Sequence, residues 1–384
     1  MKTPNQIKYV FAAILSLAIC GCRTIVKGNK KTDNINRYFW IPSSSGTVQH
    51  PIEVFDVHFC YYRPKEGNTY MFQYNYFGFF LKNGGLASGT NGIVYDENST
   101  APIPRYIAAL WLSLPERQVY YIDERLPHKQ IDNLFAKGYD YYDKDGKLKK
   151  ENYDELDLCF LPKGKVVLYL KGIQRKTLID WMGQGTATDN FNADICKVQR
   201  SESIGTHIDY IIEQDTYIDY ETPVDSLLNK YFERFSYTIN VDFADKQSKR
   251  FWGKEIYANG EELISRNRPL VESIAMPSRL KYYEVTWETD DYKYRANLHF
   301  CEEEMLRIFD EAYGNDRTQK GEFHISFGNK GETVEIYLLV GGKKYVFEKT
   351  EIEVTKQYIP HPDDDRTIVF KNYENKPQNT FRVK

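Results

Sequence analysis

The stretch Glu155–Lys171 reads ELDLCFLPKGKVVLYLK, and it decides the fold. Two runs rich in apolar and β-branched residues flank Pro162-Lys163-Gly164, which are turn-forming residues. Such runs on either side of a turn predict a β-hairpin. The same pattern returns late in the chain, where Glu322–Phe327 and Thr333–Val340 flank Asn329-Lys330-Gly331.

Residues around the two hairpins keep a nearly constant spacing, which indicates an internal repeat. The pairs Asn83 and Asn259, and Trp111 and Trp287, are both 176 positions apart. Phe135 and Phe309 are 174 apart, and Gly164 and Gly331 are 167 apart, because the loop at 138–154 is longer than the loop at 314–321. We predict an α+β fold of two tandem similar domains, each a mostly antiparallel β-sheet with one helix packed on it.

Further elements are expected in the same order in both repeats. Apolar residues at i, i+3 and i+4 predict amphipathic helices over Pro127–Lys137 and Glu303–Tyr313, each followed by glycine. A short linker helix is expected near 222–228. The remaining predicted strands are Glu53–Tyr62, Thr69–Leu81, Arg105–Leu114, Gln118–Ile122, Phe235–Phe243, Trp252–Ala258, Tyr282–Glu288 and Tyr292–Phe300.

The N-terminus has the pattern of a lipoprotein signal peptide. The first eight residues contain Lys2 and Lys8 and no acidic residue. The mostly apolar run at 9–19 follows them, and it is too short to span a membrane permanently. The segment Ile19-Cys20-Gly21-Cys22 resembles the bacterial lipobox, in which a small residue precedes the modified cysteine. The resemblance implies cleavage after Gly21 and lipidation of Cys22, and several acyl chains give stable anchoring. A plain secretory signal with an incidental cysteine is the alternative.

These features divide the chain into six parts. They are a signal peptide (1–21), a lipidated tether (22–44), the first repeat domain (45–200), a linker (201–230), the second repeat domain (231–357) and a C-terminal tail (358–384). The mature chain keeps Cys60, Cys159, Cys196 and Cys301 besides the lipidated cysteine. Four cysteines allow three complete disulfide pairings, and the sequence does not choose among them.

Composition excludes several classes of protein. The formal net charge of −3 excludes a generally basic nucleic-acid binder. The sequence contains no run of 18 apolar residues, so a protein that crosses the membrane several times is also excluded. The seven histidines form no metal-binding spacing and no CxxC pair occurs, so we expect no metal and no cofactor. Ser278 and Lys281 spell SxxK, but the SDN and KTG partners of that motif are missing, so no catalytic residue is assigned.

Three segments resemble a family of bacterial lipoproteins known as domain of unknown function 2931. They are Asp154–Gly172 with its Pro-Gly turn, Lys176–Gly185 (KTLIDWMGQG) and Lys254–Glu261 (KEIYANGE) with its Asn-Gly-Glu turn. The chain departs from the family at Lys163-Gly164, where a pair of glycines is expected. The resemblance implies a lipoprotein that faces the periplasm and has no assigned reaction. Some lipoproteins of this general kind are immunity proteins against secreted antibacterial effectors, so the resemblance implies this role as one that the chain can have.

The function that we expect is protein binding without catalysis. Aromatic residues make up 15% of the chain, and tyrosine pairs in strands place one ring on each face of a sheet. The candidate partner-binding residues are Tyr76, Trp252, Asn259 and Gly260. We expect anchoring through Cys22 in a Gram-negative envelope, by default the outer membrane facing the periplasm, with a protein partner and no nucleic acid. A glycan- or peptidoglycan-binding module is the first alternative, and an uncharacterised hydrolase is the second.

Overall fold

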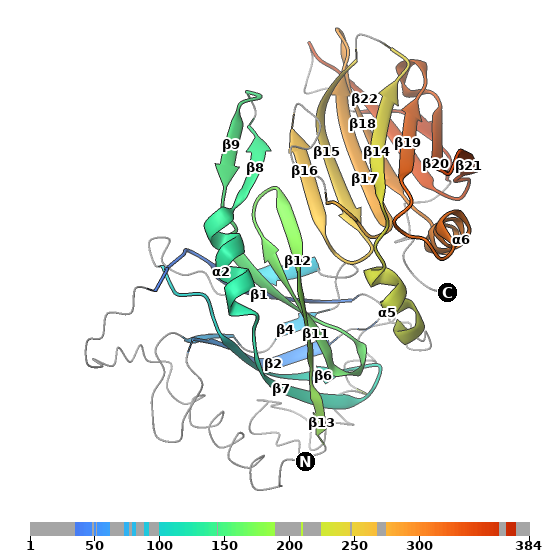
Figure 1. Cartoon of the computed structure of the whole chain (residues 1–384). Helices are drawn as coiled ribbons and strands as arrows, with labels where there is room; N and C mark the ends of the chain where they lie inside the picture. The colour runs from blue at the N-terminus through green and yellow to red at the C-terminus, as the bar shows by residue number, and fades with distance from the viewer. Residues whose placement is uncertain are drawn as a thin grey trace, which may run out of the picture.

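The computed structural model describes residues 35–47, 50, 52–61, 73–76, 79–81, 88–91, 100–143, 145–188, 209, 224–245, 248–266, 274–360 and 366–373. Within these residues the chain is mostly β-sheet with a few helices, an α+β fold dominated by strands (Figure 1). No helix in this part of the chain is long and apolar enough to cross a membrane. The signal peptide, Gly21 and Cys22 lie outside the described residues.

The first half of the chain packs two layers of strands. One layer has the order β13-β7-β6-β2-β3, with β4 (Phe79–Leu81) also paired to β2. Helix α2 (His128–Lys137) buries Ile131 and Phe135 against the same core, and the hairpin of β8 (Tyr139–Tyr142) and β9 (Leu148–Glu151) follows it. The first layer holds β2 (Ile52–Cys60), β3 (Gln73–Tyr76), β6 (Tyr106–Ser113), β7 (Gln118–Arg125) and β13 (Thr186–Thr188), and the second holds β1 (Ile41–Gly46), β5 (Ser88–Asn91), β10 (Glu155–Phe160), β11 (Lys165–Lys171) and β12 (Arg175–Gln184).

The second half also packs two layers, and α5 (Val224–Phe232) precedes them. Helix α6 (Glu302–Tyr313) buries Met305, Ile308 and Phe309 in the core between the layers. One layer holds β15 (Lys249–Tyr257), β16 (Glu262–Arg266), β17 (Leu280–Glu288), β18 (Tyr292–His299), β22 (Glu351–Tyr358) and β23 (Thr367–Lys371), and the other holds β14 (Tyr237–Phe243), β19 (Gly321–Phe327), β20 (Val334–Val340) and β21 (Lys343–Val346).

A single eleven-stranded sheet runs through both halves. Its order is β23-β22-β18-β17-β15-β16-β12-β11-β10-β1-β5, so one layer from each half forms a continuous sheet. The connection is the antiparallel pairing of β12 with β16, which joins Arg175 to Leu263 and Lys176 to Glu262. Cys159, Val167 and Tyr169 of the first half belong to the hydrophobic core of the second half. The two halves are therefore packed together rather than merely linked.

The strand pairing follows the same pattern in both halves. Strands β1 and β10 pair in parallel, as do β14 and β19, and each parallel pair leads into an antiparallel hairpin. Each hairpin turn is a 3-10 turn, Pro162–Gly164 or Asn329–Gly331, with its lysine in the left-handed region at φ 58° for Lys163 and 54° for Lys330. The ring contacts also correspond: Trp111–Tyr120 at 5.7 Å, Trp287–Tyr294 at 5.0 Å, Trp111–Phe160 at 4.8 Å and Trp287–Phe327 at 4.7 Å.

Most predicted strands and helices coincide with observed ones, and two of the predicted segments outside the repeat domains overlap or contain a strand. The predicted tether (22–44) overlaps β1, and Trp40 before it is 3% exposed. The predicted tail (358–384) contains β23. Strand β1 reads IPSSSG and has no β-forming residue after Ile41, so its sequence does not indicate a strand. It is a strand because β10 and β5 pair with it on both sides.

Candidate functional site

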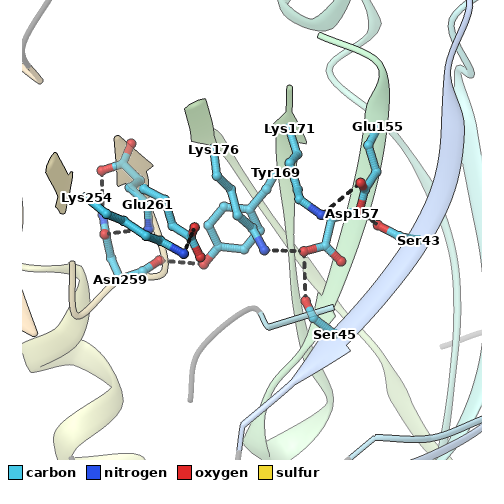
Figure 2. Close-up of polar contacts among 11 residues, drawn as sticks. Ser43, Ser45, Glu155, Asp157, Tyr169, Lys171, Lys176, Lys254, Asn259 and Glu261 are labelled. Carbon is cyan, nitrogen blue, oxygen red and sulfur yellow. Dashed lines mark hydrogen bonds and ion pairs between the residues drawn. The ribbon is translucent and has the colours of Figure 1, made fainter. Parts of the chain in front are cut away.

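A buried ion pair lies on the face of β10 and β12 that the second half covers. The Lys176 ammonium and an Asp157 carboxylate oxygen are 2.5 Å apart, and the two side chains are 2% and 0% exposed. The Ser45 hydroxyl donates a hydrogen bond to the same carboxylate oxygen at 3.0 Å. Nearer the rim, Lys171 contacts Glu155 at 2.9 Å (Figure 2). Burying a charge costs free energy unless an opposite charge pairs with it. The loss of either partner of this ion pair would therefore destabilise the fold.

Tyr169 links this ion pair to the second half of the chain, because it contacts both Lys176 and Asn259. Its ring lies beneath the Lys176 ammonium, 4.8 Å from the ring centroid, and its hydroxyl donates to the Asn259 carbonyl at 2.5 Å (Figure 2). Complete burial raises the pKa of Tyr169 far above its ordinary value. The hydroxyl is therefore a permanent hydrogen-bond donor in the folded protein.

The turn that contacts Tyr169 is held by several hydrogen bonds of its own. Asn259 donates from its side-chain amide to Glu261 at 2.8 Å, and its backbone N–H donates to the Ser278 hydroxyl at 3.1 Å. Glu261 also contacts Arg234 at 2.9 Å and accepts the backbone N–H of Leu178 at 3.3 Å. We call the set Asp157, Tyr169, Lys176, Asn259 and Glu261 the joint, because it fixes one half against the other.

The structure corrects the prediction that Asn259 and Gly260 form part of a partner-binding surface. Asn259 is 0% exposed and Gly260 is buried, so neither offers surface to another molecule. Gly260 has a φ of 81°, a conformation that suits glycine in a tight turn. The Asn-Gly signal correctly indicated a turn, but the turn contacts the first half of the same chain.

Trp252 lies on a different surface, the outward face of β15. It is partly exposed, and Thr286 lies opposite it on β17. On the same face Tyr282 donates to Glu284 and Asn297 at 2.9 Å each, and Arg295 contacts Glu284 at 2.5 Å. Burial and the neighbouring Glu284 raise the pKa of Tyr282 well above its ordinary value. Tyr76 is in β3, and its side chain lies outside the described set.

A serine, a histidine and a carboxylate also meet in the first half, which the sequence analysis did not foresee. His50 Nε2 lies 2.8 Å from the Ser113 hydroxyl and 3.2 Å from the Glu116 carboxylate. In a catalytic triad the carboxylate contacts the other ring nitrogen, Nδ1. Ser113 is 1% exposed, and Glu116 also accepts the backbone N–H of Lys163 at 2.9 Å. This cluster ties the hairpin turn to the sheet and lacks the geometry of a nucleophile.

The structure also describes the serine of the SxxK motif and three of the four cysteines of the mature chain. Ser278 is 0% exposed, and its hydroxyl accepts the Asn259 N–H instead of facing solvent. Cys60, Cys159 and Cys301 are present as thiols, while Cys196 lies outside the described residues. Across the described ranges, no group of three or more His, Cys, Asp or Glu side chains is placed to hold a metal ion.

Comparison with known families places the chain. A family model described as Protein of unknown function (DUF2931) matches residues 29–256, more than half of the 384 residues. The chain belongs to this family. The matched segment includes the first half, α5, β14 and most of β15, and it ends three residues before Asn259. No match was found among curated proteins or among solved structures.

Proposed function

We propose that this member of the DUF2931 family is a lipid-anchored envelope protein that binds a partner protein and catalyses no reaction. The observation that carries the proposal is the partly exposed face around Trp252 on a tightly packed body. Its charges, such as Arg295 and Glu284, are paired with one another, which leaves the aromatic ring as the principal group available to a partner. Tryptophan is enriched among residues that dominate binding energy at protein interfaces. Immunity against a secreted antibacterial effector is one form of this function.

The anchor rests on the N-terminal sequence. The basic start, the short apolar run and the Gly21-Cys22 step support lipidation of Cys22 and a place in the envelope of a Gram-negative bacterium, by default in the outer membrane facing the periplasm. Mass spectrometry of the mature N-terminal peptide tests it. We expect acyl chains on Cys22 and a shift of Cys22→Ala to the detergent-free fraction. An unmodified peptide that begins before residue 22 would refute the anchor.

The two halves support a second part of the proposal, that the chain is a tandem duplication. The corresponding parallel pairs, left-handed lysine turns and Trp–Tyr–Phe contacts are three independent features that share one chain order. The β8–β9 hairpin fills the longer loop of the first copy. A duplication gives two equivalent surfaces that can diverge, one for packing and one for binding.

In-cell crosslinking of the full-length lipidated protein tests the binding function. We expect one protein at a fixed ratio to the chain, and Trp252→Ala should reduce its recovery by about tenfold, the scale of a binding hot spot. Ile368→Ala, a change at an exposed edge position, is the matched control and should leave recovery unchanged. Recovery of no protein from crosslinked envelopes would overturn the proposal.

A glycan-binding role is the second candidate, and Trp252 is the observation that favours it. A sugar can pack against an aromatic side chain that solvent reaches, and Trp252 is partly exposed. Tyr337, by contrast, stacks on His324 at 4.6 Å and has the Lys344 ammonium 4.0 Å from its centroid, so its ring is already engaged. Binding of the purified protein to peptidoglycan and a polysaccharide panel separates the roles, because a protein binder should ignore both. The hydrolase alternative gains no support from the His50–Ser113 contact, because Ser113 is 1% exposed and Glu116 contacts Nε2 of His50 instead of Nδ1.

A further inference from the structure

The face of the first half that carries the joint has a counterpart in the second half. In the first half Asp157 lies opposite Tyr169, and Lys176 lies over the tyrosine ring at 4.8 Å. In the second half His324 lies opposite Tyr337, and Lys344 lies over that ring at 4.0 Å. The strands correspond in register as well, because Lys176 pairs with β11 and Lys344 pairs with β20 at the same step along each hairpin. The two tyrosine–lysine contacts thus occupy equivalent positions.

The two equivalent faces differ in what covers them. Asp157, Tyr169 and Lys176 are at most 2% exposed, and Tyr169 donates a hydrogen bond to the Asn259 carbonyl in the turn of the second half. On the outer face of the β14-β19-β20-β21 sheet, the side chains of Glu322, Glu335 and Lys344 are 53%, 56% and 44% exposed. The first face is therefore a docking site that is already filled, and its equivalent is open to solvent.

The exposed face also carries different charged side chains from the buried face. Glu322 contacts His324 at 2.9 Å, and Glu335 contacts Lys344 at 2.5 Å, so these polar groups pair with one another at the surface. Asp242 is exposed on the same face of β14, in register with Ser326. Three carboxylates and one ammonium give this face a net negative charge, which favours a basic partner.

We propose that the outer face defined by Asp242, Glu322, His324, Glu335, Tyr337 and Lys344 binds a basic turn of a partner protein, as the equivalent face binds the turn at Asn259–Glu261. The inference rests on the proposed protein-binding function, and it adds to the Trp252 face a second surface on the other sheet, with the chemistry of what that surface binds. A second copy of the chain is not the expected occupant, because the Asn259 turn of each copy is already buried against its own first half. Exposed, hydrated charges suit a partner that binds and leaves.

Site-specific photo-crosslinking tests this placement. The probe is benzoylphenylalanine introduced at position 337 of the full-length lipidated chain, with the same residue at Tyr358, exposed on β22, as the control position. We expect position 337 to attach one basic protein, identified by mass spectrometry, and position 358 to attach none of it. Attachment of that protein from position 358 alone would overturn the inference.

Charge reversal provides the second readout. The double variant Glu322→Lys/Glu335→Lys should reduce attachment of the same protein at least tenfold, which is about the loss expected for opposing like charges. Glu303→Lys, on an exposed glutamate of α6, should leave attachment within twofold. Equal attachment in all three proteins would refute the face but leave the binding function intact. Failure of the unsubstituted protein to capture any partner would remove both.

Discussion

The Asp157–Lys176 pair shows how much a single buried contact contributes. Replacing Asp157 by alanine leaves a buried lysine without its carboxylate, so we expect the free energy of unfolding to fall by about 3 kcal/mol. Glu335→Ala removes the partner of the equivalent but exposed Lys344 and should cost less than about 1 kcal/mol. Urea unfolding of both variants measures the difference. Equal losses would mean that burial of the first pair has no energetic weight.

Asp154, the residue immediately before the strand that contains Asp157, predicts a dependence of stability on pH. Burial, with Glu155 and Glu151 nearby, raises the pKa of Asp154 to about 6. The folded state therefore holds a proton that the unfolded state releases near pH 4, so stability falls as pH rises through 4 to 6. Asp154→Asn should add about 1 kcal/mol at pH 7.5, discounted because the carboxyl is partly exposed, and nothing at pH 4. The same gain at both values would contradict the assignment.

At the residue scale, the sequence predicted the local conformation of a residue better than its long-range contacts. Asn259 was predicted to be in a turn, and it is, but no sequence pattern connects it to Tyr169, 90 positions earlier. Asp157 and Lys176 belong to no motif. The available sign was a carboxylate in the middle of the apolar run LDLCF, where a charge must find a partner.

At the scale of elements, the hairpin turns hold a lysine where glycine fits better. Lys330 has a φ of 54°, and the left-handed region costs a side-chain-bearing residue roughly 1 kcal/mol. Lys330→Gly should raise the free energy of unfolding by about 0.5 kcal/mol once the flexibility of glycine is subtracted. Glu332→Gly, at a right-handed position two residues later, should lower it. Thermal unfolding of both variants decides, and a loss in Lys330→Gly would show that the turn is unstrained.

Strands with alternating or continuous apolar residues were predictable, and strands made by their neighbours were not. β10, β11, β19 and β20 carry β-branched and aromatic residues and were placed within one or two positions. β1 is a strand because its serines are buried beside acidic residues of β10, with Ser43 donating to Glu155 at 2.6 Å. Long-range pairing of this kind leaves no periodic trace in a single sequence.

At the scale of the whole molecule, the two halves of the chain pack against each other as one body. The core of the second half includes Val167 and Tyr169, so a chain cut at the end of the family match would expose them. We expect residues 29–256 alone to aggregate or to be rapidly proteolysed, and residues 22–384 to unfold in one cooperative transition. Size-exclusion chromatography and calorimetry test both. A monodisperse short fragment, or two separate transitions in the long chain, would show that the halves are independent.

The narrow pairing of β12 with β16 has a mechanical consequence. A chain held by lipid at Cys22 and loaded by a partner on its second half would transmit tension through two residue pairs and the contacts of the joint. Hydrogen bonds and ion pairs act over short distances, so such a connection resists small displacements stiffly and then releases at once. The protein would hold its partner rigidly up to a threshold force, and the eleven-stranded sheet would then separate between β12 and β16 before the strands within either half come apart.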